Sequence, residues 1–408
     1  MHSRLRFLML VGAAFLAVAN SVVFALPVQT IYGEIRVRRI VVESDTPAFA
    51  ALARKAFAAH GDYELSGEAA NVPHLRLTKI SDSAVNLVYQ AGGTRITRDI
   101  TGATWRDAVL RACDAVLVRD GNLPFFAGRL AFASDRTGKK EIYVGDLFLG
   151  EVRPVTNYGS ICVSPRWTDN GKEVLYTTYA NGNFTDIYAV NVSTGARRGV
   201  VVGARGSSIG AVSNPRTGQI AFSSSSLGDM DIFLADASGR NARRFISTKG
   251  VETDPAWSAD GGRLAFTSGP AGRPSIHIAS VPGSGAARRI NTGFNYATEP
   301  SWNPVFPDKI AFTYQSGGFH IGVVDTRTGV VEKVATTPVG NYTHPVWCAD
   351  GRHIVAVKIA GRATRLVLID TKPSANSRSG KKVTVISGPQ MANCFEPDYA
   401  GGEYARRR

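Results

Sequence analysis

The stretch YATEPSWNP, Tyr296–Pro304, places a proline directly after a glutamate and two residues before a tryptophan. Similar Pro-x-Trp segments begin at Pro255 and Pro345, each 45 residues from Pro300, and a further one begins at Pro165. Fixed periods of this length are typical of proteins built from repeated structural units. The sequence therefore predicts an array of such units.

Each copy is followed by a turn and by further segments typical of strands. After Pro255-Ala-Trp257 come the turn Ala259-Asp-Gly261, whose Asp-Gly pair suits a tight hairpin, and the apolar segment Leu264-Ala-Phe266. Other copies continue with a third segment such as Asp231-Ile-Phe-Leu234 and a fourth such as Val383-Thr-Val-Ile386. Four short strands in about 45 residues are the signature of a β-propeller blade.

The number of copies and their offset predict a closed ring of six blades. A degenerate copy, Gly210-Ala-Val212, and a final copy, Pro397-Asp-Tyr399, complete the series of innermost strands. The first blade begins at Leu130-Ala-Phe132 with no innermost strand before it, whereas the last copy has no blade after it. We expect the C-terminal strand to complete the first blade, because this closure removes an open sheet edge.

The recurring proline and tryptophan have structural explanations. Proline has no N–H to donate to a strand ladder, so it is tolerated where a strand begins. We expect the tryptophan two positions later to fill the wedge between neighbouring blades. Truncating such a buried side chain to alanine costs about 3–5 kcal/mol.

The chain before the blades lacks the period. Its first 25 residues are typical of a secretory signal peptide, with Arg4 and Arg6 before the apolar run Phe7–Ala19. An uncleaved membrane anchor is the alternative, because the apolar stretch to Val28 approaches the length of a bilayer span. The expected division is a signal peptide at 1–25, an N-terminal α/β domain with a short tail at 26–122, a six-bladed propeller at 123–400 and a basic tail at 401–408.

Two helices and several strands are expected in the α/β domain. The apolar residues of Pro47–Ala59 recur on one helical face. The other expected elements are a helix over 104–118 and strands over 36–42, 75–80, 84–89 and 95–100.

The formal net charge is +14, so the chain is strongly basic. Its arginine pairs recur once per repeat, as in Arg197-Arg198 and Arg243-Arg244, which indicates solvated outer strands. Nucleic-acid binding needs basic residues concentrated on one face, so we expect none. We expect an exported monomer with no membrane span after signal cleavage.

Three segments resemble the TolB family of the periplasmic Tol-Pal system. Asn295–Trp302 is similar to the family's T-E-P-x-W segment, Ser268–Ser275 to its S-D-x-x-G-x-P-x turn, and Pro124–Phe132 to the start of its propeller. The resemblance implies a binding protein with no enzymatic activity. It also implies that the propeller mouth binds Pal, the peptidoglycan-associated lipoprotein, and that residues 26–35 form a tail presented to TolA, as a strand added to the partner's sheet.

The residue before each proline is expected at the mouth of the central channel. These positions are Ser164, Asp254, Glu299, His344 and Glu396. An acidic ring on a basic protein suits cationic or amide groups of a partner, or a weak Ca²⁺ site in the channel. The expected partner-binding residues are Asp254, Glu299, His344 and Glu396, with Thr298, Thr343 and Tyr296 beside them. The alternative is that these side chains only bind nearby backbone amides.

Two other functions remain open at this point. A propeller lyase or glycosidase acting on acidic polysaccharide would need clustered carboxylates or histidines in the channel. An exported interaction protein outside the Tol-Pal system is the second alternative. No cofactor or transition metal is expected, because the remaining histidines fit no ligand spacing. They are His60, His74, His277, His320 and His353.

Two of the four cysteines occupy the same position in neighbouring blades. Cys162 and Cys394 each lie three residues before a Pro-x-aromatic copy. An oxidising compartment could join them in a disulfide that fastens the ring closure.

Overall fold

The structure is a computed structural model that describes residues 37–67, 71–269, 272–283, 286–335, 341–373 and 381–402. The expected signal peptide (1–25), the tail (26–35) and all but two residues of the basic tail (401–408) lie outside this part, as do residues 270–271 of the turn Ser268–Ser275. No helix among the described residues is long and apolar enough to cross a membrane. The N-terminal sheet and the propeller belong to one compact unit, Arg36–Arg408.

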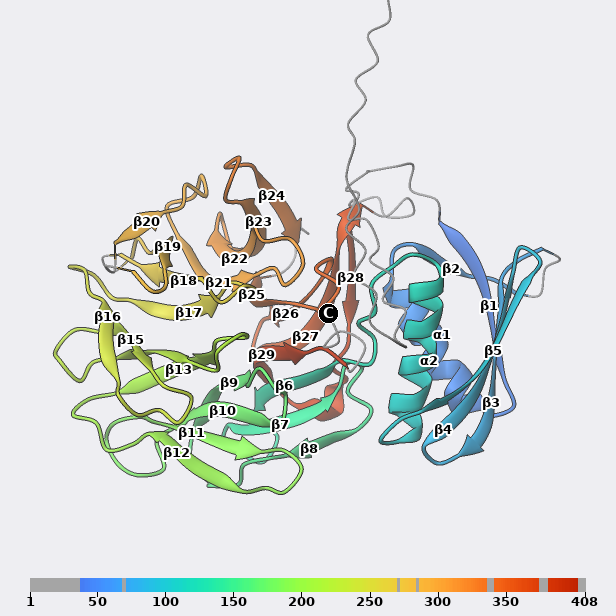
Figure 1. The fold of residues 1–408 in the computed structure, drawn as a ribbon, viewed down its shortest axis with the longest axis horizontal. Helices are drawn as coiled ribbons and strands as arrows, with labels where there is room; N and C mark the ends of the chain where they lie inside the picture. Colours follow the sequence, from blue (N-terminus) through green and yellow to red (C-terminus); the bar gives the residue numbers. More distant parts are fainter. Residues whose placement is uncertain are drawn as a thin grey trace, which may run out of the picture. The chain divides into compact units, whose positions relative to one another are not determined.

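A five-stranded sheet and two helices form the N-terminal part (Figure 1). The sheet has the order β2-β1-β3-β4-β5, in which β1 runs parallel to both of its neighbours and the other pairs are antiparallel. The elements are β1 (Arg38–Ser44), α1 (Pro47–Ala59), β2 (Tyr63–Leu65), β3 (His74–Ser81), β4 (Ala84–Ala91), β5 (Thr94–Thr101) and α2 (Trp105–Arg119). Sequence patterns missed only the three-residue strand β2.

The two helices begin where local chemistry favours it. Pro47 starts α1, a position where its missing N–H is not needed. Thr104 caps α2 by accepting a hydrogen bond from the Asp107 N–H. The apolar face of α1, including Phe49 and Phe57, is buried as the spacing predicts. Both helices share one hydrophobic core with the sheet and the first and sixth blades.

Six four-stranded sheets form the propeller (Figure 1). Blade one contains β29 (Cys394–Ala400), β6 (Arg129–Ser134), β7 (Glu141–Asp146) and β8 (Val152–Pro154). Blade two contains β9 (Cys162–Trp167), β10 (Glu173–Thr178), β11 (Asp186–Asn191) and β12 (Arg197–Val201). Blade three contains β13 (Ser208–Ser213), β14 (Ile220–Ser224), β15 (Asp231–Ala235) and β16 (Arg243–Ile246).

The remaining blades repeat this order from the innermost strand outward. Blade four contains β17 (Thr253–Trp257), β18 (Arg263–Ser268), β19 (Ser275–Ser280) and β20 (Ala287–Arg289). Blade five contains β21 (Ala297–Trp302), β22 (Lys309–Gln315), β23 (Phe319–Asp325) and β24 (Val331–Ala335). Blade six contains β25 (Asn341–Trp347), β26 (His353–Ala360), β27 (Ala363–Pro373) and β28 (Lys381–Val385), and the short 3-10 helix η1 (Pro389–Met391) precedes β29.

The predicted six-bladed ring and its closure are confirmed. Strand β29 pairs antiparallel with β6, from Cys394 opposite Ser134 to Ala400 opposite Arg129. The innermost strand of blade one thus comes from the other end of the chain. The ring has no open edge between its first and last blades.

The tryptophans lie where the repeat places them, in the hydrophobic cores between adjacent blades. Trp302 packs with residues of blades four and five, and Trp347 with residues of blades five and six. In the degenerate copy, Ala211 takes the place of the proline and Ser213 that of the tryptophan, as the strand register shows. Blade three therefore keeps the strand without its usual aromatic.

The expected disulfide is not formed, because all four cysteines are free and buried. Cys394 belongs to the core that includes blades six and one, whereas Cys162 belongs to the core between blades one and two. Side chains at the same position in neighbouring blades point to the same side of their own blades. The sheet of blade one therefore lies between the Cys162 and Cys394 sulfurs. Packed sheets are about 10 Å apart, which is too far for a disulfide.

Candidate functional site

Every innermost strand contains a β-bulge at the residue before the repeat proline or, in blade three, before Ala211. Ladder pairing with the second strand shifts at this point in each blade. The residue there has a positive φ, between 47° and 66°. The six bulge residues are Ser164, Gly210, Asp254, Glu299, His344 and Glu396. This backbone region favours glycine, and bulges commonly redirect side chains at functional sites.

Two of the bulge carboxylates connect neighbouring blades. Glu299 Oε2 accepts hydrogen bonds from the His344 N–H at 2.7 Å and from the Thr313 hydroxyl at 2.6 Å. Glu396 Oε2 accepts one from the Ser164 N–H of the next blade. The backbone-binding role that the sequence left as an alternative therefore exists for both glutamates.

Threonine hydroxyls on the second strands take the same role at two other junctions. Thr177 Oγ1 accepts a hydrogen bond from the Gly210 N–H, and Thr267 Oγ1 accepts one from the Glu299 N–H. Ser223 holds the corresponding position in blade three, and its buried hydroxyl has no partner in the described part of the chain. These hydrogen bonds join blade one to two, two to three, four to five and five to six around the channel.

Three ionisable bulge residues of blades four, five and six lie close together. His344 Nε2 lies 3.1 Å from Glu299 Oε1, and both side chains are partly exposed. Asp254 Oδ2 accepts hydrogen bonds from the hydroxyls of Thr253 and Thr267. Burial, and then the charge of Glu299, raise the pKa of Asp254, while His344 opposes the shift. The two carboxyl groups are therefore electrostatically coupled, and a cation placed beside them would favour the charged form of Asp254.

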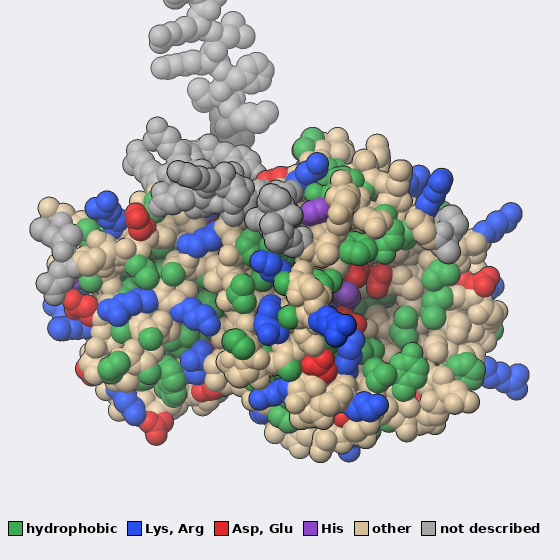
Figure 2. Space-filling view, turned by 180° about the vertical axis from the view of Figure 1, so that it is seen from behind, with side chains coloured by type: hydrophobic (Ala, Val, Ile, Leu, Met, Phe, Trp, Pro, Cys, Tyr) green, Lys and Arg blue, Asp and Glu red, His purple; other side chains and the backbone are tan. Residues whose placement is uncertain are grey.

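The other predicted partner-binding residues flank this group. Thr298 is buried and pairs with Thr313 in the ladder of blade five. Thr343 Oγ1 lies 3.1 Å from His344 Nδ1 and fixes that ring. Tyr296 is half-buried before β21, with its ring edge-to-face against Phe319. Figure 2 shows acidic and histidine side chains gathered at a hollow in the surface of the molecule.

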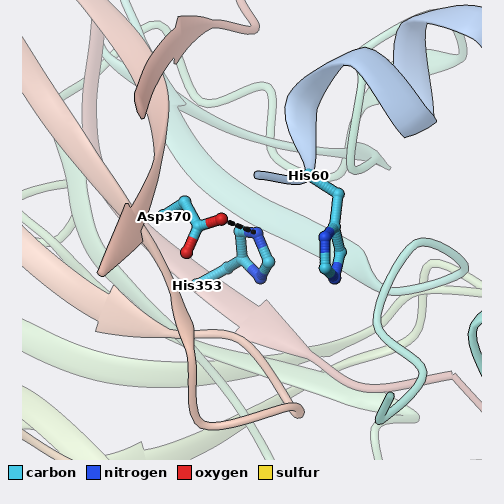
Figure 3. A group of neighbouring side chains, drawn as sticks. All are labelled: His60, His353 and Asp370. Atoms are coloured by element: carbon cyan, nitrogen blue, oxygen red, sulfur yellow. Dashed lines mark ion pairs between the residues drawn. The ribbon is translucent and has the colours of Figure 1, made fainter. Parts of the chain in front are cut away.

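A second group of ionisable residues, buried between α1 and blade six, was not expected from the sequence. His60, His353 and Asp370 offer ligand atoms that all lie within 4.8 Å of one another (Figure 3). His60 follows α1, whereas the other two come from β26 and β27 of blade six. Spacing along the sequence gives no indication of this pair, because the fold joins segments almost 300 residues apart.

Most of the charges in this second group are paired within it. Arg352 donates to both Asp370 oxygens at 2.7 Å and to both Asp62 oxygens at 2.6 and 2.8 Å. His353 Nδ1 lies 2.6 Å from Asp350 Oδ2, and its Nε2 lies 3.5 Å from Asp370 Oδ2. We call Asp62, Asp350, Arg352, His353 and Asp370 the blade-six ion network.

The surrounding charges set the protonation of the two histidines. Burial lowers the pKa of His353, but the charges of Asp350 and Asp370 outweigh it and raise that pKa to about 9. Burial, and then the charge of Arg352, hold the pKa of His60 well below its ordinary value. One ring is therefore a cation and the other is neutral at pH 7.

The donor set does not fit a transition metal. Asp370 Oδ1 accepts from Arg352 Nε and the Lys372 N–H, and Oδ2 accepts from Arg352 Nη2 and the Gly61 N–H. His60 Nδ1 accepts from the Asp62 N–H, so the neutral ring carries its proton on Nε2. A metal would have to displace these donors and sit beside the Arg352 cation.

Gly61 is the one local signal that could have indicated this junction. A Cβ at this position would lie 2.5 Å from Asp370 Oδ2, so the approach of the two segments requires glycine. The glycine follows the histidine that ends α1, but the sequence does not show which distant strand it meets. The N-terminal part is thereby fixed to blade six by backbone and side-chain bonds.

A family model described as the TolB beta propeller domain matches residues 121–394. The chain is 34% identical over 167 residues to a protein named Protein TolB homolog from Chlorobaculum tepidum. This alignment covers 40% of this chain and 37% of that relative. It is 30% identical over 159 residues to the Tol-Pal system protein TolB of Anaeromyxobacter dehalogenans, covering 39% and 36%. These alignments span little more than a third of each relative's length.

Among solved structures, TolB from Acinetobacter baumannii has the same fold. The TM-score is 0.75 with 18% sequence identity, and the match covers 89% of this chain and 96% of that chain. At this identity the likeness concerns the fold alone.

Proposed function

The chain belongs to the TolB β-propeller family, and from this we propose that it is a non-catalytic periplasmic scaffold of the Tol-Pal system. In this role the propeller mouth binds a Pal-like peptidoglycan-associated lipoprotein. The tail formed by residues 26–35 binds a TolA-like inner-membrane protein. Together these contacts support outer-membrane integrity and constriction at cell division.

The observation that carries this proposal is the set of ionisable side chains at consecutive bulges. Asp254, Glu299 and His344 occupy backbone positions that favour glycine, yet each carries a polar group. A left-handed conformation costs a residue other than glycine about 1–2 kcal/mol. Such strain is commonly kept at positions that bind other molecules.

The hydrogen bonds of Glu299 support a binding role over an enzymatic one. A glycosidase needs two carboxyl groups that can exchange protons with substrate and water. Glu299 Oε2 instead accepts from a backbone N–H and a hydroxyl of its own fold. A polysaccharide lyase or glycosidase is therefore only the second candidate function. Release of soluble sugar from acidic glycans by the purified chain would indicate it.

Weak Ca²⁺ binding at the mouth is a further part of the proposal. The ion takes six to eight oxygen ligands. Asp254 and Glu299 each have one carboxylate oxygen already engaged by donors of the chain. The second oxygen of Glu299 lies 3.1 Å from His344 Nε2, so the chain would supply few ligands, water would supply most of them and the affinity would be low.

The mouth is tested with the soluble domain of a Pal-like lipoprotein and isothermal titration calorimetry. We expect Asp254→Asn combined with His344→Gln to weaken binding by about tenfold or more, as loss of charged partners at an interface does. Asp308→Asn, at the opposite end of blade five, is the matched control. Glu299 is left intact because its loss would also remove bonds between blades. Unchanged affinity in the double variant would contradict the proposal.

The tail is tested separately by deleting residues 26–35 from the mature chain. We expect loss of binding to the periplasmic domain of a TolA-like protein, with lipoprotein binding retained. Equal loss of both activities would mean that the deletion acts on the fold.

A further inference from the structure

Exposed apolar side chains gather at one end of the propeller. Of the eight large apolar residues that are exposed among its described residues, six lie on connections in or beside blades two to four. We call these six the apolar arc. They are Ile161, Tyr179, Phe184, Val202, Leu227 and Val251. The other two, Val330 and Val385, lie at outer strands of blades five and six.

The strand order places the whole arc at the end where the innermost strands begin. Ile161, Val202 and Val251 lie on the connections that lead into β9, β13 and β17. The other three lie in the loops after β10 and β14, which run antiparallel to those innermost strands. These loops therefore turn at the same end, and the Tyr179 N–H donates to the Ile161 carbonyl across them.

Five of the six arc residues lie in blades two and three or on the connections into them, where the bulge residues carry no charge. The bulge residues of blades two and three are Ser164 and Gly210, whereas blades four, five, six and one present Asp254, Glu299, His344 and Glu396. The mouth thus has an uncharged side, continued outward by exposed apolar groups, and an ionisable side. Phe184 is 56% exposed and Leu227 is 63% exposed, although such side chains contribute favourably when they are covered.

We propose that the mouth binds an extended polypeptide segment of a partner in one orientation. The segment makes two kinds of contact, one basic and one apolar. A lysine or arginine of the segment enters the mouth beside Asp254 and Glu299. Apolar side chains on one side of that residue cover Phe184, Leu227 and their neighbours in the arc. This inference rests on the proposed use of the mouth as a docking site and adds the chemistry and the direction of the segment.

The position of the acids favours a polypeptide over a lipid surface. The plane of a bilayer does not reach side chains at a hollow (Figure 2). A basic side chain on a flexible stem reaches a recessed carboxylate while its neighbours lie on the surface around it. Hydrogen bonds from Thr267 to Asp254 and from the His344 N–H to Glu299 hold the two acids in place before the segment arrives.

The probe is a display library of random peptides of about twelve residues, each roughly 40 Å long when extended. The mature chain is the bait, and the variant Phe184→Ser with Leu227→Ser serves for counter-selection. We expect enriched peptides to share a basic residue and an apolar cluster in one fixed order. Synthetic peptides with that order, with the reversed order, and with either half alone are then measured by fluorescence anisotropy.

The two halves are separated by their response to salt. Leu227→Ser is expected to lower the affinity for the peptide by about tenfold at every salt concentration, because it removes apolar contact. Asp254→Asn is expected to weaken it at low salt and to lose its effect between about 0.01 and 1 M, where screening becomes strong. Val330→Ser, an exposed valine at the other end of the propeller, is the matched control.

The outcomes distinguish this inference from the proposed function. If peptides with the basic residue before and after the apolar cluster were enriched equally, or if enriched peptides lacked the basic residue or the apolar cluster, the inference would be wrong even if the lipoprotein binds. An empty selection would overturn it as well. Binding to phosphatidylglycerol vesicles that is lost in the Phe184→Ser, Leu227→Ser variant would assign the arc to a membrane surface. Ordered peptides without lipoprotein binding would keep the inference and refute the choice of partner.

Discussion

Replacing Arg352 by methionine should destabilise the junction between α1 and blade six more than any surface change of the same kind. The guanidinium is 9% exposed and makes four hydrogen bonds to two carboxylates. One of these, Asp370, is only 1% exposed. Removing one member of a buried ion pair typically costs about 3–5 kcal/mol, because the remaining charge stays buried without its partner.

Part of that cost is offset within the network. Asp370 would keep the N–H groups of Gly61 and Lys372 and the nearby His353 cation. Asp62 is 22% exposed and would regain water. We therefore expect a loss near the lower end of the range, about 3 kcal/mol.

Urea unfolding measures the loss, with Arg240→Met on an exposed turn as the control. Hydrogen exchange adds a local readout, since amides of α1 and β2 should lose protection while those of blades three and four keep theirs. A difference below about 1 kcal/mol from the control, or a uniform loss of protection, would refute the reasoning that this network fastens the two parts together.

Three further predictions concern pH, ring closure and thiols. His353 has a pKa raised to about 9 in the folded chain, so its stabilising effect is complete below its unfolded pKa of about 6.5 and is lost as the pH rises through 9. The unfolding free energy of the His353→Gln variant should therefore decline less over this pH range. If the variant and the unmodified protein gave parallel curves of unfolding free energy against pH, the reasoning would be wrong. A stop after Asn393 removes β29 and should leave a chain that unfolds at a much lower temperature by circular dichroism, whereas a change of only a few degrees would argue against closure by this strand. The four buried cysteines should all react with a thiol reagent only after unfolding, and a cross-linked pair in unreduced protein would contradict the structure.

The architecture was predictable because the information is local and repeated. A proline two residues before a tryptophan, a tight turn and an apolar strand recur at a fixed spacing, and each forms from its own neighbours in sequence. The bulge side chains followed from the same register. Even Gly210, in a copy without proline or tryptophan, shares the positive φ of the other bulge residues.

The contacts that sequence reasoning missed depend on distances through space. His60 and His353 meet only because α1 packs against blade six, and no spacing along the chain records that contact. The cysteine proposal failed for a related reason. Equal position in two blades was taken to mean proximity, whereas Cys162 and Cys394 lie in different cores on either side of a sheet.

The left-handed bulge has a consequence for how binding specificity can change over evolutionary time. Its backbone geometry accepts glycine, as blade three demonstrates, so substitution there need not disturb the ladder on either side. Glu299 and Glu396 are constrained by the bonds they accept from the next blade, but Asp254 and His344 are less so. A lineage could therefore exchange side chains at these two positions and acquire a different recognition pattern while the surrounding scaffold stays the same.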